Sequence, residues 1–246
     1  MSTKKKISYP TYNISSLSGF VALMEELKDT ALDSGNNSDF IFRGQTEDKP
    51  LKPRIARLSP KGELDNIEDL INSEFERLSL PFVEYQLNSE WDRLALAQHH
   101  GLPTRLLDWS YSALVALWFT VNKPPKEIDG CVSDGVVWVF KTKPDDFITF
   151  PTKESPFSQG RTRIFRPRSV TRRILAQTGV FTCHKRTKEG KYVTLEKNRS
   201  YKGRLVKIFI SGSQFKSIRG HLLANGVSRL ALFPDLDGLA RHLGGC

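Results

Sequence analysis

The chain has 246 residues, which fits one large domain or two small ones, and its 39% hydrophobic and 26% charged residues are typical of a globular protein. Its three cysteines, Cys131, Cys183 and Cys246, lack paired spacing, which excludes a disulfide scaffold and a cysteine-based zinc site and favours a reducing compartment. The longest apolar run, 113–119, is too short to span a membrane, and no apolar segment follows the basic start as in a secretory signal. We therefore expect a cytoplasmic protein without a membrane partner.

The net charge of +10 is unevenly distributed along the chain. Residues 141–204 hold 17 Lys and Arg against 5 Asp and Glu, a balance of +12, so all of the positive excess lies in this stretch. A patch of one sign attracts polyanions such as nucleic acid, or a ligand that bears phosphate. The alternative is a solvated basic loop that only improves solubility.

The first half of the chain is predicted to be mainly helical. Residues 1–14 are expected to form a flexible arm, and residues 16–31 a helix whose apolar side chains share one face. The short apolar run at 39–42 predicts a strand. Further helices are expected at 67–78, at 91–100 and, apolar nearly all round, at 111–120.

Strands dominate the second half. They are expected at 135–141, 180–184, 205–210 and 230–233, with short helices at 170–177, 214–224 and 236–243 and mostly loop at 142–167 and 185–203. Helices followed by strands are typical of an α+β fold. We expect a single domain over 15–246, with a helix-rich N-terminal half and a mixed or antiparallel sheet built mainly from the C-terminal half.

The first chemical motif is Phe42-Arg43-Gly44-Gln45, at the end of a predicted strand. An arginine beside a glycine offers a planar fork of five donors next to an uncrowded backbone, which suits bidentate capture of phosphate or carboxylate. The alternative is a structural salt bridge from Arg43 to a buried acid.

The second motif, 97–109, is dense in reactive side chains at a predicted helix end. His99 and His100 point about 100° apart on a helix, so they are not expected to hold one metal ion, and no metal site is predicted. We expect one histidine to be buried and the other to face a cleft. Arg105 and Asp108 either pair with each other, or Arg105 reaches a ligand while Asp108 orients it.

Two further motifs lie in the second half. Residues 161–173 interleave arginines with Phe165, which suits phosphate contacts and base stacking. An acidic pair at the start of 236–243, Asp235 and Asp237, is expected to cap that helix. The arginines predicted to bind nucleic acid are Arg161, Arg163, Arg166, Arg168, Arg172 and Arg173.

Together these motifs resemble the FRG domain family of bacteria and their phages. The resemblance rests on Phe-Arg-Gly at 42–44, on Leu-Ala-x-x-Gln-His-x-Gly-Leu-Pro-Thr-Arg-Leu-Leu-Asp-Trp at 94–109, and on segments 173–181 and 232–240. Members of the family occur near mobile elements, toxin modules and phage-defence systems. The resemblance therefore implies a toxin or defence effector, with a cognate antitoxin or a defence-system component as a partner.

The Phe-Arg-Gly element also resembles the start of the catalytic core in mono-ADP-ribosyltransferases, whose arginine holds a phosphate of NAD. Those enzymes place a glutamate on a late strand. This sequence departs there, since Glu189 and Glu196 lie in the basic loop and only Asp235 or Asp237 follows the last predicted strand. The resemblance implies NAD as the ligand and ADP-ribosyl transfer to a macromolecule as the reaction.

Three functions remain open from the sequence: a nucleotide-using transferase, a non-enzymatic nucleic-acid-binding module, and a sensor or partner-binding domain. For the transferase we predict that Arg43 meets the second motif in one cleft. The predicted catalytic residues are Arg43, His99, His100, Arg105 and Asp108, and the predicted ligand-binding residues are Gly44, Gln45, Thr104, Trp109, Gln177 and Asp235.

Overall fold

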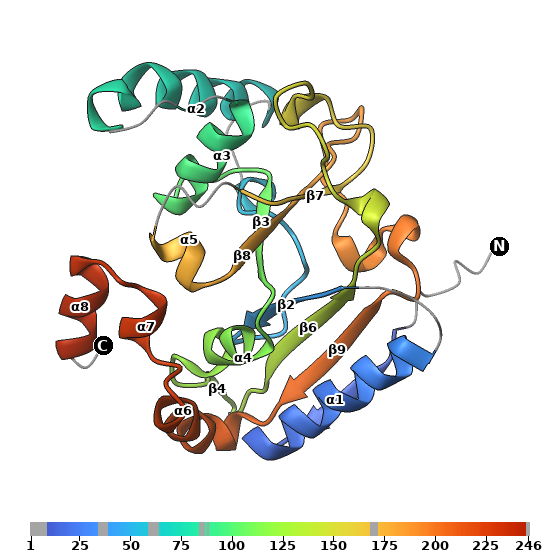
Figure 1. The fold of residues 1–246 in the computed structure, drawn as a ribbon, viewed down its shortest axis with the longest axis vertical. Helices are drawn as coiled ribbons and strands as arrows, with labels where there is room; N and C mark the ends of the chain where they lie inside the picture. Colours follow the sequence, from blue (N-terminus) through green and yellow to red (C-terminus); the bar gives the residue numbers. More distant parts are fainter. Residues whose placement is uncertain are drawn as a thin grey trace.

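A computed structural model of the protein describes residues 9–33, 39–58, 64–83, 87, 89–167 and 172–244. One mixed sheet runs through it in the order β1-β9-β6-β2-β3-β8-β7 (Figure 1). Its neighbouring strands are antiparallel except for β1 and β9, which are parallel. The strands are β1 Thr11–Ile14, β2 Phe40–Gln45, β3 Leu106–Ser110, β6 Gly135–Lys141, β7 Arg163–Phe165, β8 Gly179–Cys183 and β9 Leu205–Ile210.

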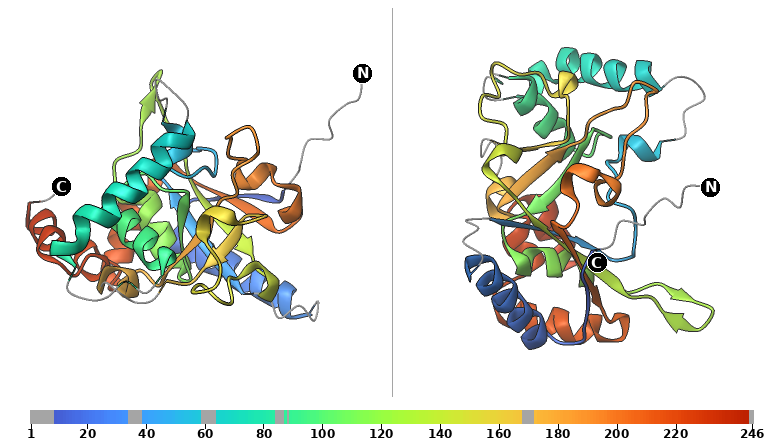
Figure 2. Two further views of the ribbon diagram at one scale, coloured as in Figure 1. Left: turned by 90° about the horizontal axis from the view of Figure 1, so that it is seen from above. Right: turned by 90° about the vertical axis from the view of Figure 1, so that its right-hand side faces the viewer.

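Helices pack on the sheet in two groups (Figure 1). Apolar side chains of α1, α4 and α6 form one core with β6 and β9, and α3 packs through Trp91 and Leu94 against β3, β7 and β8, with α2 beside it. A small hairpin of β4 and β5 projects from the body (Figure 2). The bounds are α1 Leu17–Asp33, α2 Leu64–Ser79, α3 Glu90–His99, α4 Ala113–Val121, β4 Glu127–Ile128, β5 Cys131–Val132, α5 Arg172–Ala176, α6 Phe215–Ala224, α7 Arg229–Leu232 and α8 Leu236–Leu243.

The α+β class and the helix-rich first half are confirmed, and the strand prediction is exact at β6 and β9. Two expectations are wrong. Residues 11–14 are not part of an arm, because Tyr12 and Ile14 pack on the helical core while their backbone pairs with β9. Residues 230–233 are not a strand: Ser228 accepts a hydrogen bond from the Ala231 N–H and starts helix α7. A short apolar run is compatible with either a strand or a helix.

Strands β3, β4, β5 and β7 also lie where no strand was predicted, and β3 lies next to β2, the middle strand of the sheet. β3 and β8 pair over five residues, whereas β3 meets β2 at one pair, Phe42 with Ser110. β2 instead pairs along its full length with β6. The sheet therefore separates between β2 and β3 just beyond Phe42. The Phe-Arg-Gly element lies at this opening, in the C-terminal half of β2, which continues to Gln45 and not only to Phe42 as expected.

Gly44 sets the distance between β2 and helix α4. A Cβ atom at this position would lie 1.8 Å from the Ala116 carbonyl oxygen and 2.6 Å from Thr120 Oγ1. Both partners belong to a buried helix that is capped by Ser112, whose side chain accepts the Val115 N–H. The strand and helix backbones approach each other closely only because residue 44 has no side chain.

Helix α2 is fixed to the body by a buried ion pair. Glu68 Oε1 and Oε2 lie 2.7 and 2.5 Å from Arg105 Nε and Nη2, with both side chains almost fully buried. The Tyr192 hydroxyl donates to the same carboxylate, and Arg105 Nη1 donates to the Pro156 carbonyl. Burial would lower the pKa of Arg105, but the Glu68 carboxylate outweighs it and raises that pKa. Of the two alternatives left open for Arg105, pairing with Asp108 is therefore wrong.

A Gly44→Ala substitution is expected to lower the free energy of unfolding by about 3 kcal/mol, because the added methyl group overlaps the α4 backbone. Gly220→Ala is the matched control. Gly220 lies in α6 with open space where a Cβ would be, so this change should raise stability by about 0.5–1 kcal/mol. Urea unfolding of both variants tests the difference, and equal stabilities would contradict the close approach.

Candidate functional site

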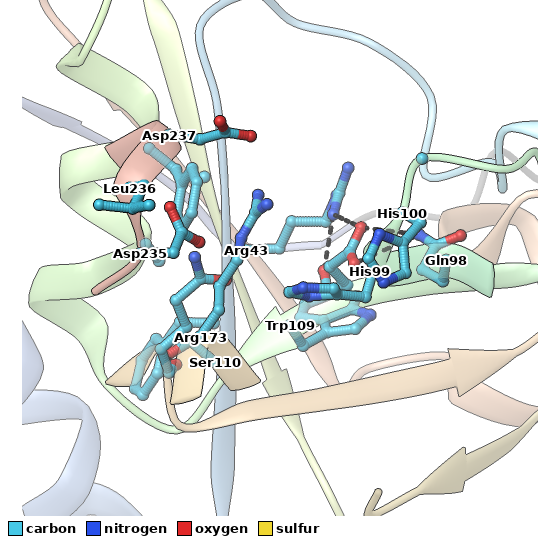
Figure 3. Close-up of a pocket in the computed structure, with 17 residues that line it drawn as sticks. Arg43, Gln98, His99, His100, Trp109, Ser110, Arg173, Asp235, Leu236 and Asp237 are labelled. Carbon is cyan, nitrogen blue, oxygen red and sulfur yellow. Dashed lines mark hydrogen bonds and ion pairs between the residues drawn. The ribbon is translucent and has the colours of Figure 1, made fainter. Parts of the chain in front are cut away.

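A cleft of about 980 Å³ opens where β2 and β3 separate. In Figure 3, Asp235, which precedes α8, and the α8 residues Leu236 and Asp237 lie on one side of it, and His99, His100 and Trp109 lie on the other. We call it the Arg43 cleft. Its lining residues are Phe42, Arg43, Gly44, Gln98, His99, His100, Gly101, Asp108, Trp109, Ser110, Ala116, Phe119, Arg173, Gln177, Asp235, Leu236 and Asp237.

Arg43 bridges the opening in the sheet. Its Nη1 donates to the Asp108 carbonyl oxygen at 2.6 Å and lies 3.6 Å from the Asp108 carboxylate. Burial lowers the pKa of Arg43, against the opposing effect of Asp108. The Nε atom is buried and has no hydrogen-bond partner among the described residues. The guanidinium is thus fixed from one side and retains donor capacity on the other.

The Asp108 carboxylate is oriented by a chain of hydrogen bonds from the preceding helix and loop. Gln98 Nε2 donates to both carboxylate oxygens at 3.2 and 3.1 Å. Thr104 Oγ1 donates to Gln98 Oε1 at 2.6 Å and accepts from the Leu106 N–H. Because Thr104 fixes which end of the Gln98 amide faces Asp108, the carboxylate has a defined position while 58% of its side chain stays exposed.

Both histidines of the second motif line the cleft, so the expectation that one of them is buried is wrong. Their rings meet edge to face with centroids 4.9 Å apart. Burial, with Arg173 and His100 nearby, lowers the pKa of His99 to about 4, although Asp235 opposes the shift. His99 is therefore a neutral imidazole at pH 7.

The opposite wall comes from the C-terminal segments. The Arg173 guanidinium lies over the Phe233 ring, 4.2 Å from its centroid, and burial lowers its pKa against the effect of Asp235 and Asp108. Gln177 joins this wall to the sheet, since its side chain donates to the Leu232 carbonyl in α7 and its own carbonyl accepts from Ser110 Oγ in β3. Asp235 caps α8 by accepting the Gly238 N–H, as predicted from the sequence.

The structure brings most of the predicted residues together but leaves three outside the cleft. Gln45 is buried and accepts from the Trp138 indole, and Thr104 acts behind Gln98. Arg105 is only 3% exposed and committed to Glu68, so it does not reach a ligand here. The predicted residues that line the cleft are Arg43, Gly44, His99, His100, Asp108, Trp109, Gln177 and Asp235.

Five polar or aromatic lining residues were missed: Phe42, Gln98, Ser110, Phe119 and Asp237. Gln98 stands in the quoted motif directly before His99, and its place near the helix end was the available signal. Ser110 and Phe119 required knowledge of β3 and of the face that α4 presents.

The arginines of 161–173 are dispersed in space. Among those that the structure describes, Arg173 alone lines the Arg43 cleft. Arg163 contacts the Phe147 carbonyl and Glu154, Arg166 donates to the Tyr111 hydroxyl, and Arg161 contacts the Asp145 carbonyl. Arg172 is exposed at the start of α5, and Arg168 lies outside the described residues.

Comparison with known proteins gives one match: residues 38–128 match the family model of the FRG domain. No curated protein and no solved structure matches the chain. The matched range ends before Arg173, Gln177 and Asp235, which complete the cleft. Within the described part of the chain, no helix is long and apolar enough to cross a bilayer, and no cluster of His, Cys, Asp and Glu is arranged to hold a metal ion.

Glu68→Gln is expected to lower the free energy of unfolding by about 3–5 kcal/mol, because it leaves the buried Arg105 charge without its partner. Arg77→Gln, which breaks an exposed pair on the same helix, should leave the melting temperature unchanged. Thermal melting of both variants checks this. An unaltered melting temperature for Glu68→Gln would contradict the structural role of the buried pair.

The free energy of unfolding should fall as the pH drops from about 6.5 toward about 5. The pKa values of His99 and the buried His184 are both lowered to about 4, so these side chains take up protons in the unfolded chain before they do in the folded one. Each such proton changes stability by about 1.4 kcal/mol per pH unit.

Urea midpoints at several pH values test this expectation. His99→Gln should make the pH dependence shallower, whereas His221→Gln, at an exposed position on α6, should leave it as in the wild type. A stability that does not change over this pH range would refute the neutral, lowered-pKa state of both histidines.

Proposed function

The chain carries an FRG domain over residues 38–128, and from the site on its Phe-Arg-Gly strand we propose that it is a nucleotide-using enzyme that transfers ADP-ribose from NAD to a macromolecular acceptor. The observation that supports this most is the Arg43–Asp108 pair at the opening between β2 and β3, with Arg173 across the cleft. Such a transferase would serve as a toxin or defence effector.

The charges of the Arg43 cleft suit a dinucleotide that has both anionic and cationic parts. Arg43 and Arg173 offer donors to phosphate oxygens, and arginine binds phosphate through charge-assisted hydrogen bonds. The carboxylates of Asp108, Asp235 and Asp237 face the same volume. NAD carries two phosphates and a positively charged nicotinamide riboside. The arginines would therefore face the phosphates, and the carboxylates would face the nicotinamide riboside.

The donor set at Arg43 fits a phosphate. Its Nη1 is occupied by Asp108, while its buried Nε has no partner among the described residues. A buried donor without an acceptor is unfavourable by about 1–3 kcal/mol. An oxyanion on this guanidinium would engage the donor capacity that Asp108 leaves, and the Phe42 and Phe119 side chains provide apolar wall next to it.

In the proposed reaction the bond between the nicotinamide nitrogen and ribose C1 breaks, and its electron pair stays with nicotinamide. An acceptor oxygen or nitrogen then bonds to C1 and loses a proton. The Asp108 carboxylate, held by Gln98, would stabilise the positive charge that develops on the ribose. The neutral imidazole of His99 can accept the proton of the acceptor.

Nucleotide binding is tested first, by titration calorimetry with NAD and ADP-ribose. Arg43→Lys should weaken binding by about 10- to 100-fold, because lysine lacks the planar fork. Lysine is preferred to alanine, since removing the charge would also leave the Asp108 carbonyl without its donor and confuse binding with folding. Absence of binding by the folded wild type would contradict the proposal.

Transfer is tested by the release of nicotinamide from NAD. Asp108→Asn should lower kcat by about 10²–10³-fold while ADP-ribose still binds, because the carboxylate charge acts on the transition state. Asp129→Asn, in the β4–β5 turn away from the cleft, is the matched control and should keep full activity. If the protein binds NAD but releases no nicotinamide, the nucleotide site is supported and the proposed transfer reaction is contradicted.

A further inference from the structure

A second cavity, which we call the basic pocket, lies at the end of β6 and the start of β9. Its volume is about 470 Å³, and it shares no lining residue with the Arg43 cleft. Five basic and two acidic side chains line it, which leaves a net charge of +3. The lining residues are Lys141, Lys143, Asp145, Asp146, Arg161, Ser200, Lys202, Gly203 and Arg204.

Arg204 forms a rigid part of this pocket. Its guanidinium carbon lies 5.2 Å from the Phe140 ring centroid and 4.9 Å from that of Tyr201. Nη2 is 2.9 Å from Asp146 Oδ2, and 14% of the side chain is exposed. Nη2 thus forms an ion pair with Asp146 without the alignment of a hydrogen bond, and the buried Nε has no hydrogen-bond partner within the described residues. The guanidinium is therefore fixed before any ligand arrives.

Asp146 positions Arg204 without cancelling the charge of the pocket. Its carboxylate is 4% exposed and accepts the Lys143 N–H at 2.7 Å, so it is tied to the turn after β6. The exposed side chains of Lys143, Lys202 and Arg161 surround the opening. A fixed arginine among flexible lysines is a favourable arrangement for a phosphate group.

The positive charges continue beyond the pocket. A neighbouring cavity of about 390 Å³ shares Lys143 with it and is also lined by Arg166. The Arg166 guanidinium lies over the Phe147 ring at 3.9 Å, which fixes it as the two aromatic rings fix Arg204. Arg204, Lys143 and Arg166 thus form a row of cations, which matches the repeated charges of a chain better than a single anion.

We propose that the basic pocket binds a phosphate group in the phosphodiester backbone of a nucleic acid, with Arg204 as the fixed contact and Lys143 and Lys202 as the flexible ones. This inference does not depend on the nature of the reaction in the Arg43 cleft. Part of the positive charge excess of 141–204 lies in this pocket. The arginine-rich segment 161–173 alone did not indicate the pocket, because Lys143, Lys202 and Arg204 lie outside that segment.

The test measures the anisotropy of labelled single-stranded RNA and DNA of about 12 nucleotides at salt concentrations from about 50 to 200 mM. The variant Lys143→Gln/Lys202→Gln changes exposed side chains and leaves Arg204 and its aromatic contacts in place. Binding should weaken about tenfold at low salt, and the log–log salt slope should become shallower by about 0.7 for each phosphate that a lysine no longer neutralises.

The matched control is Lys28→Gln/Lys216→Gln, which removes the same charge from exposed positions on α1 and α6. This control should bind as the wild type does. An equally weakened affinity in both double variants would overturn the proposal, because binding would then follow net charge alone. Binding of inorganic phosphate without binding of either oligonucleotide, or no binding of any of them, would overturn it as well. Melting temperatures confirm that both variants are folded.

Discussion

The contact between Arg43 and Asp108 holds the two parts of the sheet together where their backbones separate. β2 and β3 share one backbone pair, and beyond it the Arg43 guanidinium donates to the Asp108 carbonyl that strand pairing would otherwise satisfy. Because the guanidinium supplies the hydrogen bond that a neighbouring strand would have made, this arginine contributes to the fold as well as to the cleft. The cleft exists because a side chain replaces a row of backbone hydrogen bonds, which leaves an opening between the strands.

The sequence reveals those parts of the fold that depend on local periodicity. β6 and β9 are continuous β-type runs, and α8 has a capping aspartate directly before it, so their bounds follow from composition and caps. β3 does not show in this way. It is five residues long, mostly buried, and contains Asp108 between Leu107 and Trp109, so neither a period of two nor an apolar run marks it.

The candidate site is predictable to the extent that motifs mark it. The Phe-Arg-Gly and Gln-His motifs indicate that Arg43 meets His99, His100 and Asp108, although these segments lie far apart in the chain. The ion pair of Arg105 is not predictable from the sequence, because its partner Glu68 lies in the distant helix α2 and no local sequence pattern links the two residues. Arg43 lines the cleft whereas Arg105 is buried away from it, a distinction that only tertiary packing makes.

The two cavities differ in the distribution of their charges and therefore suit different ligands. In the Arg43 cleft, two arginines face three carboxylates, and the lowered pKa of His99 prevents a further positive charge at neutral pH. Such a cleft does not attract a polyanion by charge alone and selects a ligand by matching the positions of both signs. The basic pocket has a net charge of +3, so long-range attraction acts there. A macromolecular anion held at the basic pocket and a nucleotide held in the cleft would therefore not compete for the same residues, so the two proposed ligands would be able to bind one chain together.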